Sequence, residues 1–188
     1  MAFDLDTFRN KMQDGGARPS LFEMEINFPL AGSGVNTDSA RFLTKISEIP
    51  GSTIGQITVP YFGRQLKVAG DRTFAALSVT IINDEAYALR AKFEQWMDKI
   101  ARHEASVGST RLDFYQTDLG LRQMKRNGGI SAEYVFVGAF PTALGTIALD
   151  WSSEAIEEYT VEFQYQYWNA STLTQTNVDF DFNADFNL

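Results

Sequence analysis

A run of alternating side chains near the C-terminal end places the strongest constraint on the fold. Within Ala155–Trp168, large apolar residues occupy every second position from Tyr159 to Tyr167, and Glu, Thr and Gln stand between them. The apolar set is Tyr159, Val161, Phe163, Tyr165 and Tyr167. Successive side chains of a strand point to opposite faces of a sheet. This period of two therefore predicts a strand over 155–168 with one buried and one polar face.

Several other segments carry strand signals of the same kind. Leu21–Phe28 alternates and is ended by Pro29, while Thr73–Asn83 places Leu77, Val79 and Ile81 on its inner side. The remaining strand candidates are Arg41–Ile49 after a loop over 31–40, Thr110–Thr117, Leu121–Arg126, and Ile130–Phe140, which Pro141 ends. We expect turns at 118–120 and at the Asn-Gly-Gly of 127–129. The chain is thus predicted to be mainly β.

One segment, Asp84–His103, is helical in pattern. Leu89, Phe93, Trp96 and Ile100 recur at helical spacing and form a single apolar stripe. Asn83 or Asp84 is suited to cap the N-terminus of the helix. We therefore expect one helix flanking the sheet, and the stripe is interpreted as core.

Composition excludes several classes of site. The chain has no cysteine, which rules out disulfides and thiolate metal sites. Its single histidine, His103, falls in the last turn of the expected helix, where partial positive charge is favourable. The net charge of -8 argues against a DNA-binding domain, which needs clusters of Lys and Arg.

The motif search gives no catalytic or phosphate-binding set, and no cofactor or metal is expected. Glu154, Glu157 and Glu158 are interpreted as surface acids. The basic cluster of Arg122, Lys125 and Arg126 either protects a sheet edge or meets an acidic partner. The N-terminus carries acids where a signal peptide has bases, and no apolar run approaches the roughly 20 residues of a membrane span. We expect a soluble protein without a membrane partner.

The segment 51–72 is long for a weakly structured stretch in a compact domain. It combines glycines and a proline with apolar residues that are a liability when exposed on a monomer. These apolar residues are Ile54, Ile57, Val59, Tyr61 and Phe62. Two interpretations stand: a mobile surface hairpin, or an arm that pairs with another subunit.

The order and spacing of short motifs over about residues 20–168 resemble the tail tube proteins of contractile-tail (myovirus-type) bacteriophages. The motifs are Ile49-Pro50-Gly51, Tyr61-Phe62-Gly63-Arg64, Lys67-Val68-Ala69-Gly70-Asp71-Arg72, Thr80-Ile81-Ile82-Asn83-Asp84, Phe93-Glu94-Gln95-Trp96 and Val137-Gly138-Ala139-Phe140-Pro141. The resemblance implies a β-sandwich or split barrel with one flanking helix. It also implies that six subunits form a ring in which the inner strands close into one barrel.

The resemblance further implies that rings stack into a hollow tube inside a contractile sheath, through which DNA passes. Sheath, baseplate, tail terminator and tape-measure proteins are the implied partners, in a virion assembled in the host cytoplasm. The early loop would reach a neighbouring subunit or ring, which adds Arg64, Lys67, Asp71 and Arg72 to the candidate contact residues. The implied organisation is an N-terminal segment 1–20, a tube domain 21–168 and a C-terminal arm 169–188. We expect some acids of the sheet to face the lumen, where they would repel DNA.

Two other functions remain open from the sequence. The chain is also consistent with the tube of a contractile injection device, such as a bacteriocin or a type VI-like system. A carbohydrate-binding β-sandwich would need an exposed aromatic platform, for which Tyr165, Tyr167 and Trp168 are the available set. An enzyme is not expected.

Overall fold

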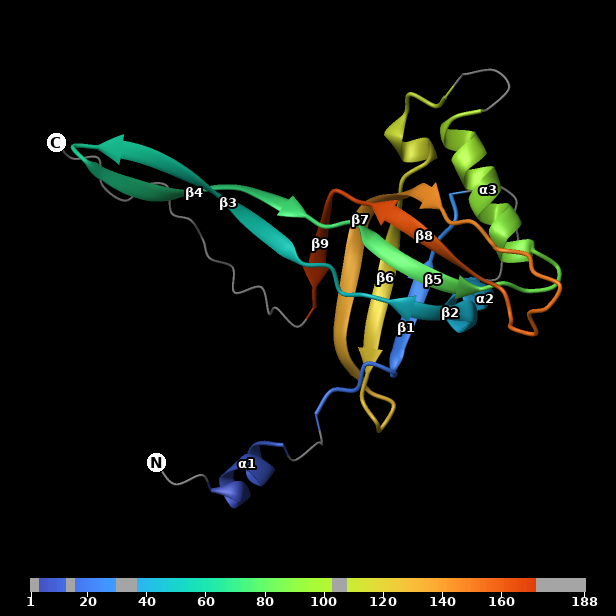
Figure 1. Cartoon of the computed structure of the whole chain (residues 1–188), viewed down its shortest axis with the longest axis horizontal. Helices are drawn as coiled ribbons and strands as arrows, with labels where there is room; N and C mark the ends of the chain where they lie inside the picture. The colour runs from blue at the N-terminus through green and yellow to red at the C-terminus, as the bar shows by residue number, and fades with distance from the viewer. Residues whose placement is uncertain (1–3, 13–15, 30–36, 103–107, 172–188) are drawn as a thin grey trace.

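The computed structural model describes residues 4–12, 16–29, 37–102 and 108–171 (Figure 1). The α-helices are α1 (Leu5–Lys11), α2 (Thr37–Leu43) and α3 (Ala88–Ile100), and Leu112–Phe114 forms a short 3-10 turn. The strands are β1 (Phe22–Ile26), β2 (Thr44–Ser47), β3 (Ser52–Tyr61), β4 (Arg64–Phe74), β5 (Leu77–Ile82), β6 (Thr117–Met124), β7 (Ile130–Leu144), β8 (Glu158–Gln164) and β9 (Tyr167–Ala170). The expected mainly-β fold with a flanking helix is confirmed.

The long strand β7 belongs to two layers. Its first part pairs with β6 and β9, and β6 also pairs with β1. From Phe140 onward it pairs with β8, which continues through β5 to β2. The segment 158–170 changes layers at the same corner. Its first strand, β8, pairs with the end of β7, and its second strand, β9, pairs with the middle of β7. Such corners, where strands switch sheets, join the two layers of a sandwich.

Gly138 makes this corner possible. Its φ is 65°, a conformation that side chains with a Cβ rarely adopt. Its backbone N–H donates to Asp118 Oδ1 at 3.0 Å. A Cβ at this position would also lie 3.1 Å from Gln166 Cγ, so the corner is closely packed.

The substitution Gly138→Ala is expected to lower the free energy of unfolding by about 1–2 kcal/mol, because alanine is strained at positive φ. Urea denaturation of the purified protein measures the change. Gly120→Ala in β6 is the matched control, since its φ is not positive and its Cβ would make ordinary contacts with Glu25. Equal stability of the two variants would contradict the role assigned to Gly138.

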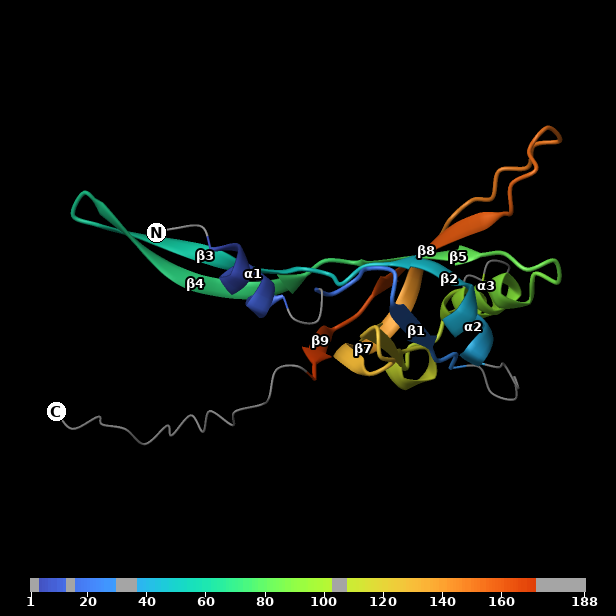
Figure 2. The ribbon, with the colours of Figure 1, turned by 90° about the horizontal axis from the view of Figure 1, so that it is seen from below.

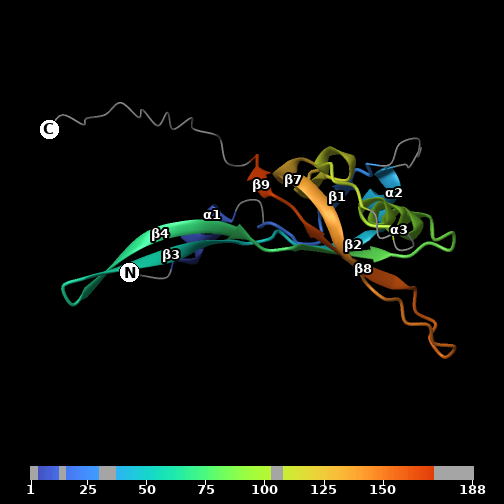
Figure 3. The same ribbon diagram turned by 90° about the horizontal axis from the view of Figure 1, so that it is seen from above.

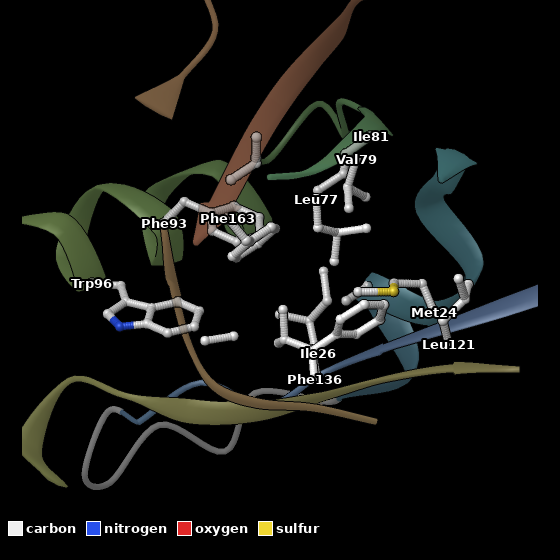
Figure 4. Close-up of a cluster of buried hydrophobic side chains, with 14 of the residues drawn as sticks. Met24, Ile26, Leu77, Val79, Ile81, Phe93, Trp96, Leu121, Phe136 and Phe163 are labelled. Carbon is white, nitrogen blue, oxygen red and sulfur yellow. The ribbon is translucent and has the colours of Figure 1, made fainter. Parts of the chain in front are cut away.

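The core lies between the two layers and is closed by α3 (Figure 4). Phe93 of α3 packs against Phe28 and Phe163, with ring centroids 5.1 Å and 6.0 Å away. Trp96 is fully buried, and its indole Nε1 donates to the Tyr115 carbonyl at 2.7 Å. The sheets contribute Met24, Ile26, Leu77, Val79, Ile81, Leu121 and Phe136. The predicted inner faces of 21–28, 73–83 and the helix are confirmed.

The prediction of a loop over 31–40 and a strand over 41–49 is wrong for residues 37–43, which form helix α2. The helix extends to Leu43 and leaves only Thr44–Ser47 as strand. Its Ala40 is fully buried, so packing of this small residue onto the core outweighs the strand signal. Residues 30–36 and His103 lie outside the described part of the chain.

Three further boundaries differ from the sequence prediction. The expected strand 110–117 contains the 3-10 turn, and β6 runs unbroken through the expected turn at 118–120. The strand β7 passes Pro141, which lies at a register shift where the missing N–H is tolerated. Helix α3 begins at Ala88, after Tyr87 with φ 52°, although Asp84 Oδ2 still accepts from the Ala88 N–H at 3.4 Å.

The predicted single strand 155–168 is two strands. Tyr165 and Gln166 separate β8 from β9, and the Gln166 N–H donates to Val137 O at 3.0 Å. The expected strand 73–83 is likewise divided, since Thr73 and Phe74 end β4. Through Tyr165 the apolar alternation of the sequence continues while the pairing partner changes, whereas Phe74 and Leu77 are three positions apart, so the alternation shifts between β4 and β5.

Candidate assembly arm

The strands β3 and β4 form a two-stranded sheet that projects far from the sandwich (Figures 1 and 2). Nearly all its side chains are exposed, and among the described residues these strands pair only with each other. We call Ser52–Phe74 the arm. An isolated two-stranded hairpin is at best marginally stable in water, so an arm this long is typical of a segment that needs a partner surface.

The tip of the arm is a two-residue turn at Phe62 and Gly63. Their φ angles are 42° and 77°, the positive pair that a type I′ hairpin turn requires. Phenylalanine is unfavourable at positive φ by about 1–2 kcal/mol. Its ring is nevertheless 91% exposed and stacks edge-on with Tyr61, at 4.7 Å between centroids. The turn therefore places a pair of aromatic rings at the exposed tip of the arm.

The register divides the arm into two faces. Cross-strand pairs Ile57–Val68, Val59–Leu66 and Tyr61–Arg64 share one face, here called the apolar face. The pairs Thr58–Lys67 and Pro60–Gln65 occupy the opposite face. The candidate residues Ile57, Val59, Tyr61 and Arg64 are thus brought together, while Lys67 is on the other side. Leu66 and Val68 were missed, although their alternation with Gln65 and Lys67 is visible in the sequence.

The remaining candidates Ile54, Asp71 and Arg72 lie nearer the base of the arm, beyond a register shift at Gly55. There Gly70 approaches Gly55 so closely that a Cβ would lie 3.2 Å from the Gly55 carbonyl oxygen. A bulge of this kind increases the local twist and bends the ribbon.

The base of the arm is attached to the sandwich by aromatic contacts. Phe74 packs against Tyr165 and Trp168, with centroids 6.1 Å and 6.4 Å away. The Tyr165 hydroxyl donates to Ala75 O at 2.6 Å, and burial raises the pKa of Tyr165. These contacts fix where the arm leaves the body.

The other sequence-level candidates do not form a site. Tyr165 is buried and Trp168 packs against Phe74 and Tyr134, so Tyr167, which is 46% exposed, is left without the flat exposed platform of several rings that a carbohydrate site needs. Arg122 lies in β6, an interior strand, between Glu25 at 3.1 Å and Glu133 at 2.6 Å, so it does not protect an edge. The hydrogen bond with Glu133 is the main reason that its pKa is raised.

Among the residues that the structure describes, no group of three or more acidic or imidazole side chains has the geometry to hold a metal ion. None of the described helices is long and apolar enough to cross a membrane.

Comparison with known proteins identifies the family. Residues 17–171 match the family model described as phage tail tube protein. The chain belongs to this family. The tail tube protein gp19 of Enterobacteria phage T4 is 32% identical over 154 residues, which cover 81% of this chain and 90% of that protein. The tail tube protein of Serratia phage KSP90 is 30% identical over 165 residues, 86% of this chain and 93% of that one.

The fold has counterparts among solved structures. A chain of the anti-feeding prophage baseplate aligns with a TM-score of 0.62 at 17% identity, covering 82% of this tail tube protein and 95% of that chain. A chain of the sheath–tube complex of the extracellular contractile injection system PVC aligns with a TM-score of 0.63 at 10% identity, covering 90% and 98%. These structures share the fold. The predicted resemblance is confirmed, and the chain is a structural tail tube protein, a virion component and not an enzyme.

Proposed function

We propose that this tail tube protein forms rings of six copies that stack into a hollow tube, and that the arm holds the copies together. The observation that carries the proposal is the apolar face of the arm, which its own subunit leaves uncovered. Burial of apolar surface is the main favourable term in association. The number six follows the anti-feeding prophage baseplate, whose structure is 6-fold symmetrised.

The layer formed by β2, β5, β8 and the end of β7 supports closure of the ring. Within the described residues, β2 has one neighbour and the end of β7 has one neighbour, so each side of this layer has an unpaired edge. Pairing of one edge with the opposite edge of the next copy would hide both and generate a closed barrel. Ile46, exposed on β2, would be covered by the same contact.

The outer face of this layer is suited to line the lumen. It carries Ser78, Thr80, Thr160 and Glu162, while the alternate residues face the core. Glu158 on the same face is paired with Lys45 at 2.6 Å. A polar and acidic wall repels the DNA backbone within a Debye length of roughly 8 Å and offers no cluster of bases to retain it. DNA and a tape-measure protein would therefore pass without tight binding.

The tube would lie inside a contractile sheath and end at a baseplate and a terminator. The sheath–tube complex and the sheath/tube terminator of PVC support these partners by analogy of fold. The tube domain would comprise residues 21–168, which β9 extends through Ala170, and the N-terminal segment 1–20 would precede it. Residues 172–188 of the expected C-terminal arm 169–188 lie outside the described part of the chain. A non-viral injection device is the alternative. The viral relatives favour a phage, and the packaged content of purified particles separates the two.

Shortening the arm tests the proposal. Gln56–Ala69 can be replaced by Asn-Gly, since Gly55 and Gly70 already approach each other and Asn-Gly forms a tight hairpin turn. The shortened protein is expected to fold, with unchanged fluorescence of the buried Trp96, yet to form no rings or tubes in negative-stain electron microscopy over a concentration series. The intact protein in the same series is the control. Tubes formed by the shortened protein would contradict the proposed role of the arm.

A further inference from the structure

The loop between β7 and β8, residues 145–157, is a second projection of the molecule. It points away from the sandwich at the end opposite the arm (Figures 2 and 3). Its apolar side chains are unusually exposed for an ordered loop: Trp151 is fully exposed, and Leu149 and Ile156 are 79% and 72% exposed. We call residues 145–157 the Trp151 loop. A tryptophan at the tip of a projection is typical of an interface anchor.

Hydrogen bonds hold this tip in one shape. Asp150 Oδ1 accepts from the Ser152 N–H at 2.9 Å and from its hydroxyl at 2.8 Å, and the N–H bond is the main reason that the pKa of Asp150 is lowered. The Ser153 N–H donates to Asp150 O at 3.2 Å and closes the turn. Trp151 is thereby presented by a preformed turn, which reduces the entropy cost of binding.

Both ends of the Trp151 loop are also attached to the body. At its start, the Gly145 N–H donates to Thr160 O at 2.7 Å, and Arg90 Nη1 donates to Gly145 O at 3.1 Å. At its end, Glu157 Oε2 accepts from the Tyr87 hydroxyl at 2.7 Å and from Asn83 Nδ2 at 2.9 Å. The loop therefore projects as a stiff element.

The charge of the Trp151 loop complements that of the arm. The loop carries Asp150, Glu154 and Glu157 and has no lysine or arginine. The arm as a whole carries three bases, Arg64, Lys67 and Arg72, against one acid, Asp71, and of these Arg64 lies on the apolar face while Lys67 lies on the opposite face. Opposite charges at the rim of an apolar contact steer association and reject wrong pairings.

We propose that the arm of one copy docks on the Trp151 loop of another copy, with the apolar face of the arm against Leu149, Trp151 and Ile156. The two surfaces lie at opposite ends of the subunit, so their contact is head-to-tail and can be repeated along a tube. Arg64, on the apolar face near the tip, would lie against the Trp151 indole in a cation–π contact. This inference rests on the proposed tube assembly and names the surface that receives the arm.

Engineered cysteines test the contact in assembled protein, because the chain has none of its own. The variant Val68→Cys/Ala155→Cys places one thiol on the apolar face of the arm and one on the Trp151 loop, both at exposed positions. Oxidation of assembled tubes is expected to give a ladder of covalent multimers on a non-reducing gel. The single variant Val68→Cys, and Val68→Cys/Arg126→Cys with its second thiol on the β6–β7 hairpin, are expected to give no ladder.

A second measurement uses Trp151 itself. Trp151→Ala is expected to raise the protein concentration needed for tube formation by about tenfold or more, as for the loss of an interface anchor. Trp151→Phe keeps an aromatic ring, so it should raise the concentration needed for tube formation by a smaller factor than Trp151→Ala. Because Trp151 is fully exposed, neither change should alter the folded subunit.

The outcomes separate this inference from the proposed function. Tubes of the double variant that give no ladder, together with normal assembly of Trp151→Ala, would overturn the docking contact and leave the tube assembly standing. Failure of the unmodified protein to form rings or tubes would contradict the proposed function, and the docking contact with it.

Discussion

Replacing Val59 and Leu66 together by threonine is expected to abolish tube formation while the subunit stays folded. The two residues face each other across the arm and are 45% and 61% exposed, so they contribute little to the stability of the isolated subunit. Threonine is β-branched, a shape that strands favour, but it removes apolar surface from the proposed contact. Each lost anchor at an interface typically costs 1–2 kcal/mol or more, and the loss repeats at every subunit of a ring.

The matched control uses the adjacent cross-strand pair on the opposite face. Thr58→Ser with Lys67→Thr changes the same two strands one register position away. Sedimentation velocity should show unassembled subunits for the Val59/Leu66 variant at concentrations where the control forms tubes. Equal assembly by both proteins would show that the apolar face is not the contact surface.

The second large effect is expected in the core. Phe93→Ala should lower the free energy of unfolding by about 3–5 kcal/mol, the usual range for a buried phenylalanine. Phe93 is fully buried, and the rings of Phe28, Trp96, Tyr159 and Phe163 surround it at 5.1, 6.5, 6.4 and 6.0 Å. Its removal would leave a cavity at the point where α3 meets both layers.

Urea denaturation followed by tryptophan fluorescence measures this loss, because Trp96 is buried beside Phe93. The control is Phe42→Ala in α2, where the ring is 78% exposed and the change should stay within about 0.5 kcal/mol. A loss at Phe93 as small as that at Phe42 would mean that α3 does not close the core.

Local periodicity predicted the strands whose two faces differ. Leu77, Val79 and Ile81 are buried as their alternation indicates, and the stripe of α3 is the core face of that helix. Periodicity could not show where a strand changes its partner. The alternation through Tyr165 and Tyr167 continues while the chain leaves β8 and enters β9, because pairing depends on residues distant in the sequence.

The arm, too, was predicted only in part, because its register depends on cross-strand pairing. The composition of 51–72 indicated an arm, and the register then separated its apolar face from Lys67. The Trp151 loop was missed, although a tryptophan flanked by Asp150 and Ser152 was a usable signal. Its exposure depends on how the turn presents the side chain, which periodicity does not report.

The central claim is that the arm joins neighbouring copies in a tube, and an electron cryo-microscopy map of the assembled tube tests it most directly. We expect the apolar face of the arm to be buried against a neighbouring subunit, and Glu162 to face the lumen. A map in which the arm lies in solvent, or folds back on its own subunit, would contradict the claim.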